Sequence, residues 1–317
     1  MGGKQGCKML ILGILLGLLA AALAVAYGAY RFAYYSPHKN QNDPYLAPDG
    51  HRYTPEEGPT FALIREMEEL PFEPVTIRSR DGLQLFGRYY AVAEGAPLQI
   101  QMHGYRGHAL RDFCGGHKLA RSLGLNTLVV DQRAHGKSEG HTISFGINER
   151  WDCLCWAEYA ARRWPGTPIS LAGISMGAAT VLMASDLPLP EEVKGILADC
   201  GYSSPRAIIK EVCCGLPKIF RAFYPFTSLS AELFGHFDPD SGSAVGAVSN
   251  TRLPILLIHG EADSFVPCRM SREIAAACAS PVTLETFPGA EHGVSYFADQ
   301  ERYRRVVTDF LKSCGAL

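Results

Sequence analysis

A five-residue segment with a serine at its centre constrains this chain more than any other feature. Gly173-Ile174-Ser175-Met176-Gly177 follows the β-like run Ile169 to Ala172 and opens the helical run Gly177 to Ala184. A sharp turn from a strand into a helix brings backbone close to the serine, so small residues are needed on either side. The turn lifts the hydroxyl clear of the sheet and points the N–H groups of the helix N-terminus at the same place. The pattern alone is weak in a chain with 32 glycines, and an ordinary turn is the alternative, but its place between a strand and a helix makes it specific.

Strand and helix patterns alternate along most of the chain. Asp81-Gly82 between two β-like runs predicts an opening hairpin. The segments that follow alternate short apolar runs with helical spacing, which is typical of a mostly parallel sheet with helices on both faces. The predicted strands are 75–80, 83–90, 98–102, 127–130, 169–172, 193–198, 255–258 and 282–287, and the predicted helices are 61–70, 112–123, 149–164, 177–184, 271–279 and 299–312.

The stretch 202–251 breaks this alternation. It lies between two predicted strands, is too long for one crossover helix and is rich in aromatic residues. We predict that it forms a helical cap over the carboxyl edge of the sheet and that some of its aromatic side chains line a substrate pocket. Core packing is the alternative for each of them, because aromatic residues occur in cores as readily as in pockets. The candidate pocket residues are Phe220, Phe223, Tyr224, Phe226 and Phe234.

A serine nucleophile needs a base, and the base needs a group that orients it. His292 follows the predicted strand 282–287, and Asp263 follows the predicted strand 255–258. These two side chains and Ser175 are therefore expected beyond the carboxyl ends of strands, where open α/β sheets place their sites. We predict Ser175 as nucleophile, His292 as base and Asp263 as acid.

Other residues compete for these roles. Asp199, after the preceding strand, and Glu261, two residues before Asp263, are alternative acids, although Glu261 is expected as a loop residue. Asp131 and Arg133 are expected to pair with each other or to brace the loop after their strand. Four further histidines lie near strand ends, where such residues more often stabilise turns than act as bases: His103, His108, His135 and His259.

Several short segments, in one order along the chain, resemble those of the α/β-hydrolase superfamily. They are Met102-His103-Gly104-Tyr105, the run Asp131 to Ser138, the Gly173–Gly177 turn, the run His259 to Asp263, and Glu291-His292-Gly293. The resemblance covers the chain from about Phe72 to the C-terminus, and it is strongest to membrane-anchored serine hydrolases of uncharacterised substrate. It implies the α/β-hydrolase fold with a helical cap, the chain order Ser, Asp, His, and an oxyanion hole formed by the backbone N–H groups of Tyr105 and Met176.

This set of residues predicts a serine hydrolase that cleaves a carboxylic ester, or a related acyl bond, through an acyl-enzyme. The same residues suit a peptidase, an amidase or an acyltransferase, and a membrane-tethered binding module without activity is the alternative from another class. The mechanism needs no metal and no organic cofactor, and no cysteine or histidine spacing suggests zinc. The aromatic cap predicts a small-molecule or lipid-like acyl substrate. The formal net charge is −2 and the sequence has no Lys/Arg-rich run, so nothing in its charge pattern suggests a nucleic-acid partner.

The N-terminus differs from the rest of the chain. Met9 to Ala29 carries no charge, and roughly 20 apolar residues at about 1.5 Å each cross a bilayer core. We predict an uncleaved signal-anchor helix within 1–35, and a signal peptide cleaved at Ala24-Val25-Ala26 is the alternative. The linker and strap 36–71 and the hydrolase domain 72–317 would follow. Four tyrosines are expected at the far membrane interface as an aromatic belt: Tyr27, Tyr30, Tyr34 and Tyr35.

Flanking charges and cysteines bear on the membrane face. Lys4 and Lys8 stand before the apolar segment, against Arg31 and Lys39 after it. Together with the α-amino group, they predict an inside N-terminus and an extracytoplasmic catalytic domain. The ten cysteines leave the topology open, because pairs such as the adjacent Cys213-Cys214 form no easy disulfide and suit a reducing compartment.

Overall fold

An eight-stranded sheet forms the centre of the protein, for which the computed structural model describes residues 2–37, 43–47, 52–55, 58–212 and 217–317. The spatial order is β1-β2-β4-β3-β5-β6-β7-β8, with β2 antiparallel to β1 and to β4 and all other neighbours parallel. Every predicted strand is present, so the mostly parallel sheet is confirmed. The strands are β1 (Glu73–Arg78), β2 (Gln84–Tyr90), β3 (Leu98–Met102), β4 (Asn126–Val130), β5 (Ile169–Ile174), β6 (Val193–Asp199), β7 (Ile255–Gly260) and β8 (Val282–Phe287).

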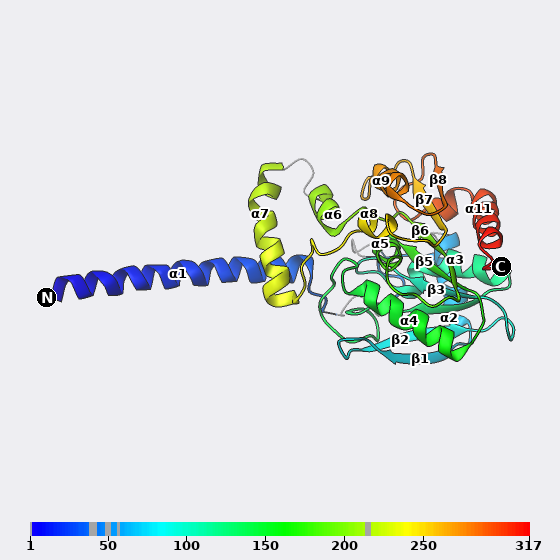
Figure 1. Ribbon diagram of the computed structural model, residues 1–317, viewed down its shortest axis with the longest axis horizontal. Helices are drawn as coiled ribbons and strands as arrows, with labels where there is room; N and C mark the ends of the chain where they lie inside the picture. The colour runs from blue at the N-terminus through cyan, green and yellow to red at the C-terminus, as the bar shows by residue number, and fades with distance from the viewer. Residues whose placement is uncertain (1, 38–42, 48–51, 56–57, 213–216) are drawn as a thin grey trace.

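Helices cover both faces of this sheet, as the alternation predicted (Figure 1). The domain 72–317 contains α3 (Ala109–Ser122), α4 (Glu149–Arg163), α5 (Met176–Met183), α9 (Arg269–Ala277), α10 (Ser295–Ala298) and α11 (Gln300–Ser313), and α2 (Pro59–Glu69) lies in the strap. α3 begins three residues earlier than predicted, because His108 caps it by accepting the N–H of Leu110.

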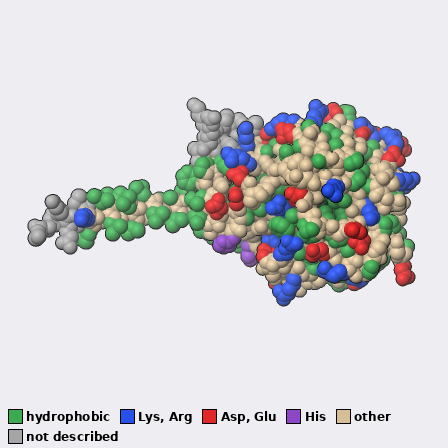
Figure 2. All heavy atoms as spheres, viewed as in Figure 1, with side chains coloured by type: hydrophobic (Ala, Val, Ile, Leu, Met, Phe, Trp, Pro, Cys, Tyr) green, Lys and Arg blue, Asp and Glu red, His purple; other side chains and the backbone are tan. Residues whose placement is uncertain are grey.

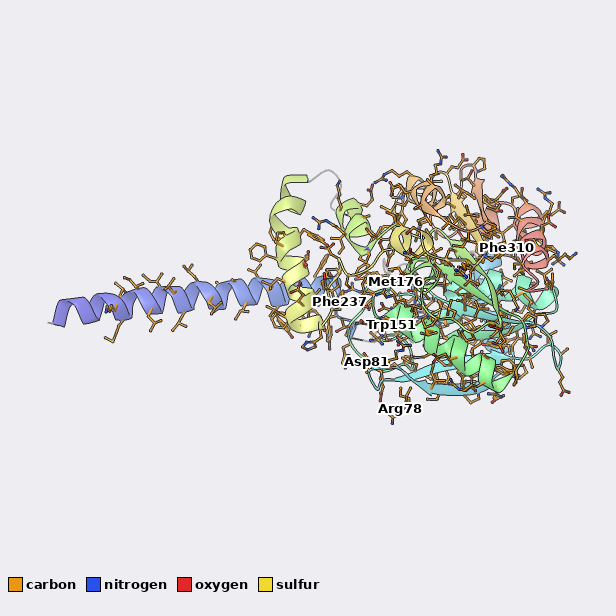
Figure 3. All side chains as sticks on the ribbon, viewed as in Figure 1. Arg78, Asp81, Trp151, Met176, Phe237 and Phe310 are labelled. Atoms are coloured by element: carbon orange, nitrogen blue, oxygen red, sulfur yellow. The ribbon has the colours of Figure 1, made fainter. Side chains whose placement is uncertain are left out.

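Alternate residues of the strands feed two separate hydrophobic clusters. Leu171 of β5 belongs to the first cluster, with Trp156 of α4, and its neighbour Ala172 belongs to the second, with Phe310 of α11. Since successive side chains of a strand point to opposite faces, the clusters lie on the two sides of the sheet. Figure 3 labels Met176 in the first cluster and Phe310 in the second.

α1 (Gly2–Ala33) leaves the body as one long helix covered by hydrophobic side chains (Figures 1 and 2). Its stretch Lys8–Ala33 has 26 residues and includes an 18-residue window with a mean hydropathy of 2.8, which is long and apolar enough to cross a membrane. The same length and composition also suit a signal sequence near an N-terminus.

The end of α1 enters the hydrophobic core of the domain. Tyr30 and Tyr34 are buried and belong to the first hydrophobic cluster, and Ala26 is buried as well. The predicted aromatic belt is therefore wrong for Tyr30 and Tyr34, whose rings pack against protein, whereas Tyr27 remains about half exposed. A helical spacing of four residues puts positions 26, 30 and 34 on the one face that meets the domain.

The stretch 202–251 is helical, as predicted. It contains α6 (Pro205–Val212), α7 (Pro217–Ser230), the π-helical turn η2 (Ala231–Gly235) and α8 (Ala244–Val248). α7 and η2 contact α1, and α7 crosses its C-terminal part (Figure 1). The ring of Phe234 lies 5.3 Å from that of Tyr27 and 5.9 Å from that of Tyr30, so aromatic packing joins this stretch to the N-terminal helix.

Candidate active site

Ser175 sits on the turn between β5 and α5. Its φ of 55° is left-handed, a conformation that costs a non-glycine residue on the order of 1–3 kcal/mol and that clusters at functional sites. A Cβ added to Gly173 would lie 2.2 Å from the Gly177 carbonyl oxygen. A Cβ added to Gly177 would lie 1.8 Å from the Met102 carbonyl oxygen. The Ser175 N–H donates to the Asp199 carbonyl oxygen at 2.8 Å, which ties the turn to β6. The turn therefore requires both glycines and leaves the serine at its tip.

His292 joins Ser175 to Asp263. Its Nε2 lies 2.9 Å from Ser175 Oγ, and its Nδ1 lies 2.7 Å from Asp263 Oδ2. The Asp263 carboxylate accepts a hydrogen bond from the Nδ1–H group, so the neutral ring presents Nε2 as an acceptor to the serine hydroxyl. The Asp263 side chain is fully buried, whereas 27% of the His292 side chain is exposed. The three side chains thus form one hydrogen-bonded path from a buried carboxylate to the cavity beside Ser175.

Asp263 is held in the loop after β7 by several donors. Its Oδ1 accepts the N–H groups of Val266 at 2.7 Å and Phe265 at 3.0 Å, and His259 Nε2 lies 3.3 Å from Oδ2. Burial alone would raise the pKa of Asp263, but the contacts with His259 and His292 and the Val266 N–H outweigh it and hold that pKa well below its ordinary value. Asp263 therefore carries a negative charge near neutral pH.

The alternative acids have different partners. Asp199 is buried at the end of β6, and it accepts a hydrogen bond from the Tyr303 hydroxyl at 3.0 Å. Burial raises the pKa of Asp199 to about 6. Glu261 is exposed and accepts a hydrogen bond from Thr286 at 2.7 Å, as expected of a loop residue. Asp263 is the carboxylate within hydrogen-bond distance of His292 in the part of the chain that the structure describes.

The other histidines fix backbone, as the sequence predicted. His103 accepts the Gln132 N–H at Nε2 and donates from Nδ1 to the Gly104 carbonyl oxygen at 2.8 Å. His135 bonds the Arg133 carbonyl oxygen at 2.8 Å, and His259 bonds that of Val266 at 2.7 Å.

Asp131 and Arg133 do not pair with each other. Asp131 pairs with Arg88 at 2.7 Å and also accepts the Lys137 N–H, so it braces its loop. Arg133 pairs with Asp152 at 2.6 Å.

The loop after β3 borders the serine on its other side. A Cβ added to Gly104 would lie 3.5 Å from Ser175 Cβ, and Gly104 and Tyr105 both line the cavity there. Asp112 accepts the Gly104 N–H at 2.9 Å and pairs with Arg111 at 2.8 Å, which balances its charge. Met176, the other predicted oxyanion donor, is the first residue of α5, so its N–H has no acceptor within the helix. Both predicted donors belong to segments that border Ser175, and their role in catalysis stays a prediction.

A cavity of about 480 Å³ opens beside the serine. Ser175 and His292 form part of its wall, and the ring of Phe265 lies 5.2 Å from the His292 ring in an edge-on arrangement. The remaining wall comes from the loop after β3, the start of α3, the strap and the loop after His292. These lining residues are Ala47, Tyr53, Thr60, Gly104, Tyr105, Arg106, Arg111, Asp112, Ile174, Gly293, Val294 and Phe297.

The predicted aromatic pocket residues do not line this cavity. Tyr224 is buried and donates to Asp240, and Phe234 packs on Tyr27 and Tyr30 of α1. Phe223 and Phe226 are exposed on α7, and the side chain of Phe220 lies outside the described residues. The four described residues lie away from this cavity, because the stretch 202–251 packs toward α1 and the strap borders the serine instead, and their role in substrate binding stays a prediction.

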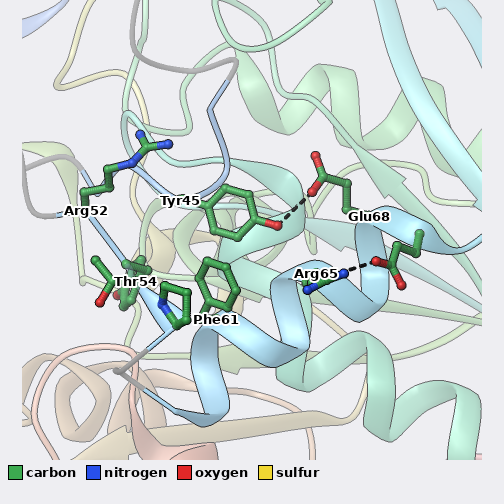
Figure 4. Close-up of a pocket in the computed structure, with 9 residues that line it drawn as sticks. Tyr45, Arg52, Thr54, Phe61, Arg65 and Glu68 are labelled. Carbon is green, nitrogen blue, oxygen red and sulfur yellow. Dashed lines mark hydrogen bonds and ion pairs between the residues drawn. The ribbon is translucent and has the colours of Figure 1, made fainter.

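A second hollow of about 430 Å³ lies beside α2 and shares Tyr53 with the serine cavity (Figure 4). Its wall carries charged groups in exposed pairs, with Tyr45 donating to Glu68 at 2.8 Å and Arg65 to Glu69 at 2.9 Å. Exposed pairs of this kind contribute little to the stability of the fold. Neither pair contains a nucleophile that is hydrogen-bonded to a base. The hydrogen-bonded path of Ser175, His292 and Asp263 lies at the other cavity.

One group of potential metal ligands occurs among the described residues. Ligand atoms of Cys200, Asp263 and His292 all lie within 4.8 Å of one another. Two of them already belong to the hydrogen-bonded path, so a metal bound there would compete with the contact between His292 and Ser175. Burial raises the pKa of the Cys200 thiol well above its ordinary value, which disfavours the thiolate that such a metal needs.

Sequence reasoning missed Asp112 and the strap residues of the cavity wall. Asp112 is an ordinary acidic residue near a helix N-terminus, and its bond to Gly104 joins two elements whose distance is set by the tertiary fold. The strap was predicted, but its path across the serine carries no local sequence signal.

Comparison with known proteins agrees with this architecture. Residues 98–236 match the family model described as serine aminopeptidase, S33. The chain is 25% identical over 256 residues to the uncharacterised protein YqkD of Bacillus subtilis, covering 79% of this chain and 82% of that protein. It is 24% identical over 255 residues to protein bem46 of Schizosaccharomyces pombe, covering 76% and 77%.

Solved structures share the fold. The esterase Pf2001 of Pyrococcus furiosus superposes with a TM-score of 0.63 at 22% identity, covering 87% of this chain and 99% of the esterase. Mouse alpha/beta hydrolase domain-containing protein 10 superposes with a TM-score of 0.56 at 18% identity, covering 76% and 99%. The shared sheet, the match of the family model across the serine turn and the order of the motifs lead to one conclusion: this chain has the α/β-hydrolase fold.

Proposed function

We propose that this hydrolase is a serine esterase that cleaves a carboxylic ester, or a related acyl bond, through an acyl-enzyme on Ser175. The observation that carries the proposal is the hydrogen-bonded path from Ser175 Oγ through His292 to Asp263, with contacts of 2.9 and 2.7 Å. Path and cavity meet at the serine, so a bound carbonyl carbon would lie within reach of Oγ.

The reaction follows from the roles of these groups. His292 Nε2 takes the hydroxyl proton while Oγ forms a bond to the substrate carbonyl carbon. The N–H groups of Tyr105 and Met176 stabilise the oxyanion, and the C–O bond to the leaving group then breaks. His292 returns its proton to the departing alcohol. His292 then deprotonates a water molecule as that water attacks the acyl carbon. The bond between Oγ and the acyl carbon breaks, His292 returns the proton to Ser175 Oγ, and the acid is released, while Asp263 stabilises the imidazolium in both halves.

The lining of the cavity supports an apolar acyl or alcohol group. Ile174, Phe265, Val294 and Phe297 contribute apolar surface to it. Burying each methylene of a substrate chain stabilises binding by about 0.8 kcal/mol. We therefore propose a small-molecule or lipid-like acyl substrate.

A series of p-nitrophenyl esters from acetate to decanoate tests this proposal. We expect kcat/KM to rise with chain length up to the size that the cavity holds, and mass spectrometry of quenched enzyme to find the acyl group on the Ser175 peptide. Activity on acetate alone would contradict the apolar pocket. Acylation of another residue would contradict the mechanism.

Peptidase or amidase activity is the second candidate, because the matched family model is described as serine aminopeptidase. The same acyl-enzyme serves both reactions, with an amine instead of an alcohol as the leaving group. Aminoacyl-p-nitroanilides assayed beside the matching p-nitrophenyl esters separate the two. Higher kcat/KM on the anilides would favour the peptidase.

We further propose that α1 anchors the enzyme to a membrane as a single span, with the catalytic domain on the extracytoplasmic side. The apolar stretch Lys8–Ala33 supports the span, and Lys4 and Lys8 before it support this orientation. The full chain is expected to stay in membranes through a carbonate wash and to resist protease added to sealed inverted vesicles. Release by carbonate would exclude the anchor, and digestion in intact inverted vesicles would reverse the orientation.

A further inference from the structure

The last carbonyl groups of α1 accept hydrogen bonds from the loop that borders the catalytic serine. The Tyr105 hydroxyl donates to the Ala33 carbonyl oxygen at 2.8 Å, and Arg106 donates to those of Phe32 at 2.7 Å and Tyr35 at 3.3 Å. Carbonyls at the end of a helix have no intrahelical donor and carry partial negative charge. A hydroxyl and a guanidinium are therefore fitting partners for them.

The same loop has a strained backbone that needs support. Arg106 has a φ of 47°, a left-handed conformation that persists in a non-glycine residue only when its surroundings hold it. On one side Asp112 accepts the Gly104 N–H at 2.9 Å, and the Gly107 N–H donates to the Gly104 carbonyl oxygen at 3.0 Å. On the other side the Tyr105 ring stacks 5.0 Å from the Phe145 ring, and the described side-chain hydrogen bonds of Tyr105 and Arg106 go to the end of α1 and to Tyr35 just beyond it.

The end of α1 is a rigid base for these contacts. The Tyr34 ring is fully buried in the first hydrophobic cluster, and the Tyr34 carbonyl oxygen accepts the Ile143 N–H at 2.8 Å. The last turns of the helix are thus fixed to the hydrolase domain independently of the loop after β3.

We propose that the end of α1 is a structural part of the oxyanion hole, and that Tyr105 and Arg106 are positioning residues that fix the loop to it. The inference rests on the proposed esterase function, in which the Tyr105 N–H stabilises the oxyanion. Each side chain acts through the backbone of its own loop, because both bond to helix carbonyls rather than to the reacting atoms. The N-terminal helix is then more than a tether, since catalysis depends on where its last turns sit.

Tyr105→Phe in the full chain is the direct test, because it removes the hydroxyl and keeps the backbone N–H and the ring that stacks 5.0 Å from Phe145. We expect kcat to fall about tenfold or more, with KM changed less than twofold, because a displaced oxyanion donor acts on the transition state alone. Arg106→Ala should lower kcat in the same way, and Arg106→Lys should restore part of it.

Tyr30→Phe is the matched control, since it also removes one tyrosine hydroxyl bond between α1 and the hydrolase domain, but at Thr142. We expect its kcat to stay within twofold of the wild type. The proposal would be overturned if Tyr105→Phe kept the kcat of the wild type, or if Tyr105→Phe and Tyr30→Phe lost kcat to the same extent.

Hydrogen exchange of the peptide 103–112 provides a readout that needs no turnover. We expect faster exchange in Tyr105→Phe than in the wild type and unchanged exchange in Tyr30→Phe. If the wild-type protein showed no esterase turnover, the proposed function would be overturned. The hydrogen-exchange measurement would still decide whether α1 holds the loop. Exchange in Tyr105→Phe that matches the wild type would overturn the inference alone.

Discussion

Replacing Ser175 with alanine is expected to lower kcat for p-nitrophenyl esters by about five to six orders of magnitude, to the level left by binding and the oxyanion hole. The loss is this large because Oγ forms the bond to the acyl group, and the alanine methyl has no lone pair. The fold should survive, since Ala accepts the left-handed φ of 55° at a cost similar to that of Ser. The measurement is kcat under saturating ester, together with labelling by a fluorophosphonate probe, which should disappear.

Ser185→Ala is the matched control for this variant. Ser185 lies two residues after the end of α5, is buried, and has an Oγ without a hydrogen-bond partner among the described residues. The same substitution there should leave kcat and labelling unchanged. Labelling of Ser175→Ala at the wild-type rate, or more than about 1% residual turnover, would show that another residue is the nucleophile.

The sheet and the turn at Ser175 are predictable from sequence because their signals are local. Each of these signals indicates a backbone conformation within a few residues: the Asp81-Gly82 turn, the β-like runs and the two glycines around Ser175. Strand direction then limits where His292 and Asp263 lie, since the carboxyl ends of parallel strands share one edge. The structure joins these residues by hydrogen bonds, and their catalytic roles remain predictions for the two variants argued in this Discussion.

Features that depend on long-range packing were not predictable in this way. The aromatic residues of α7 and η2 have helical spacing, which indicates an apolar face but not what covers it, and here the partner of Phe234 is α1. The left-handed backbone conformation of Arg106 occurs at a residue other than glycine, so the sequence does not indicate it. The contact of Arg106 with Phe32 spans 74 positions of sequence. Tyr30 and Tyr34 fit a membrane belt by composition alone, because burial against protein and burial in an interface favour the same side chains.

Asp263→Asn is expected to lower kcat by about four orders of magnitude with little change in KM. An asparagine amide that donates to His292 Nδ1 would hold the ring in the tautomer with its proton on Nε2, where it cannot take the serine proton. It would also remove the negative charge that stabilises the imidazolium. The N–H groups of Phe265 and Val266 can still be accepted by the amide oxygen, so the loop should fold. Thermal unfolding measured beside kcat separates a folding defect from a catalytic one.

Asp199→Asn is the matched substitution that decides between the two buried carboxylates. Asp199 accepts a hydrogen bond from Tyr303 rather than from His292, so we expect kcat to remain within about tenfold of the wild type.

The folded pKa of Asp199 is about 6, above the ordinary 3.8, so ionisation penalises the folded state as pH rises from about 4 through 6. The neutral asparagine escapes that penalty, and the variant should gain stability relative to the wild type above pH 6, on the order of 3 kcal/mol, and none below pH 4. The catalytic assignment predicts opposite outcomes for two like substitutions: a large loss of kcat at every pH in Asp263→Asn, and a pH-dependent change in stability in Asp199→Asn. A larger loss of kcat in Asp199→Asn than in Asp263→Asn would make Asp199 the acid that orients His292, and the hydrogen bond between His292 and Asp263 would then be structural.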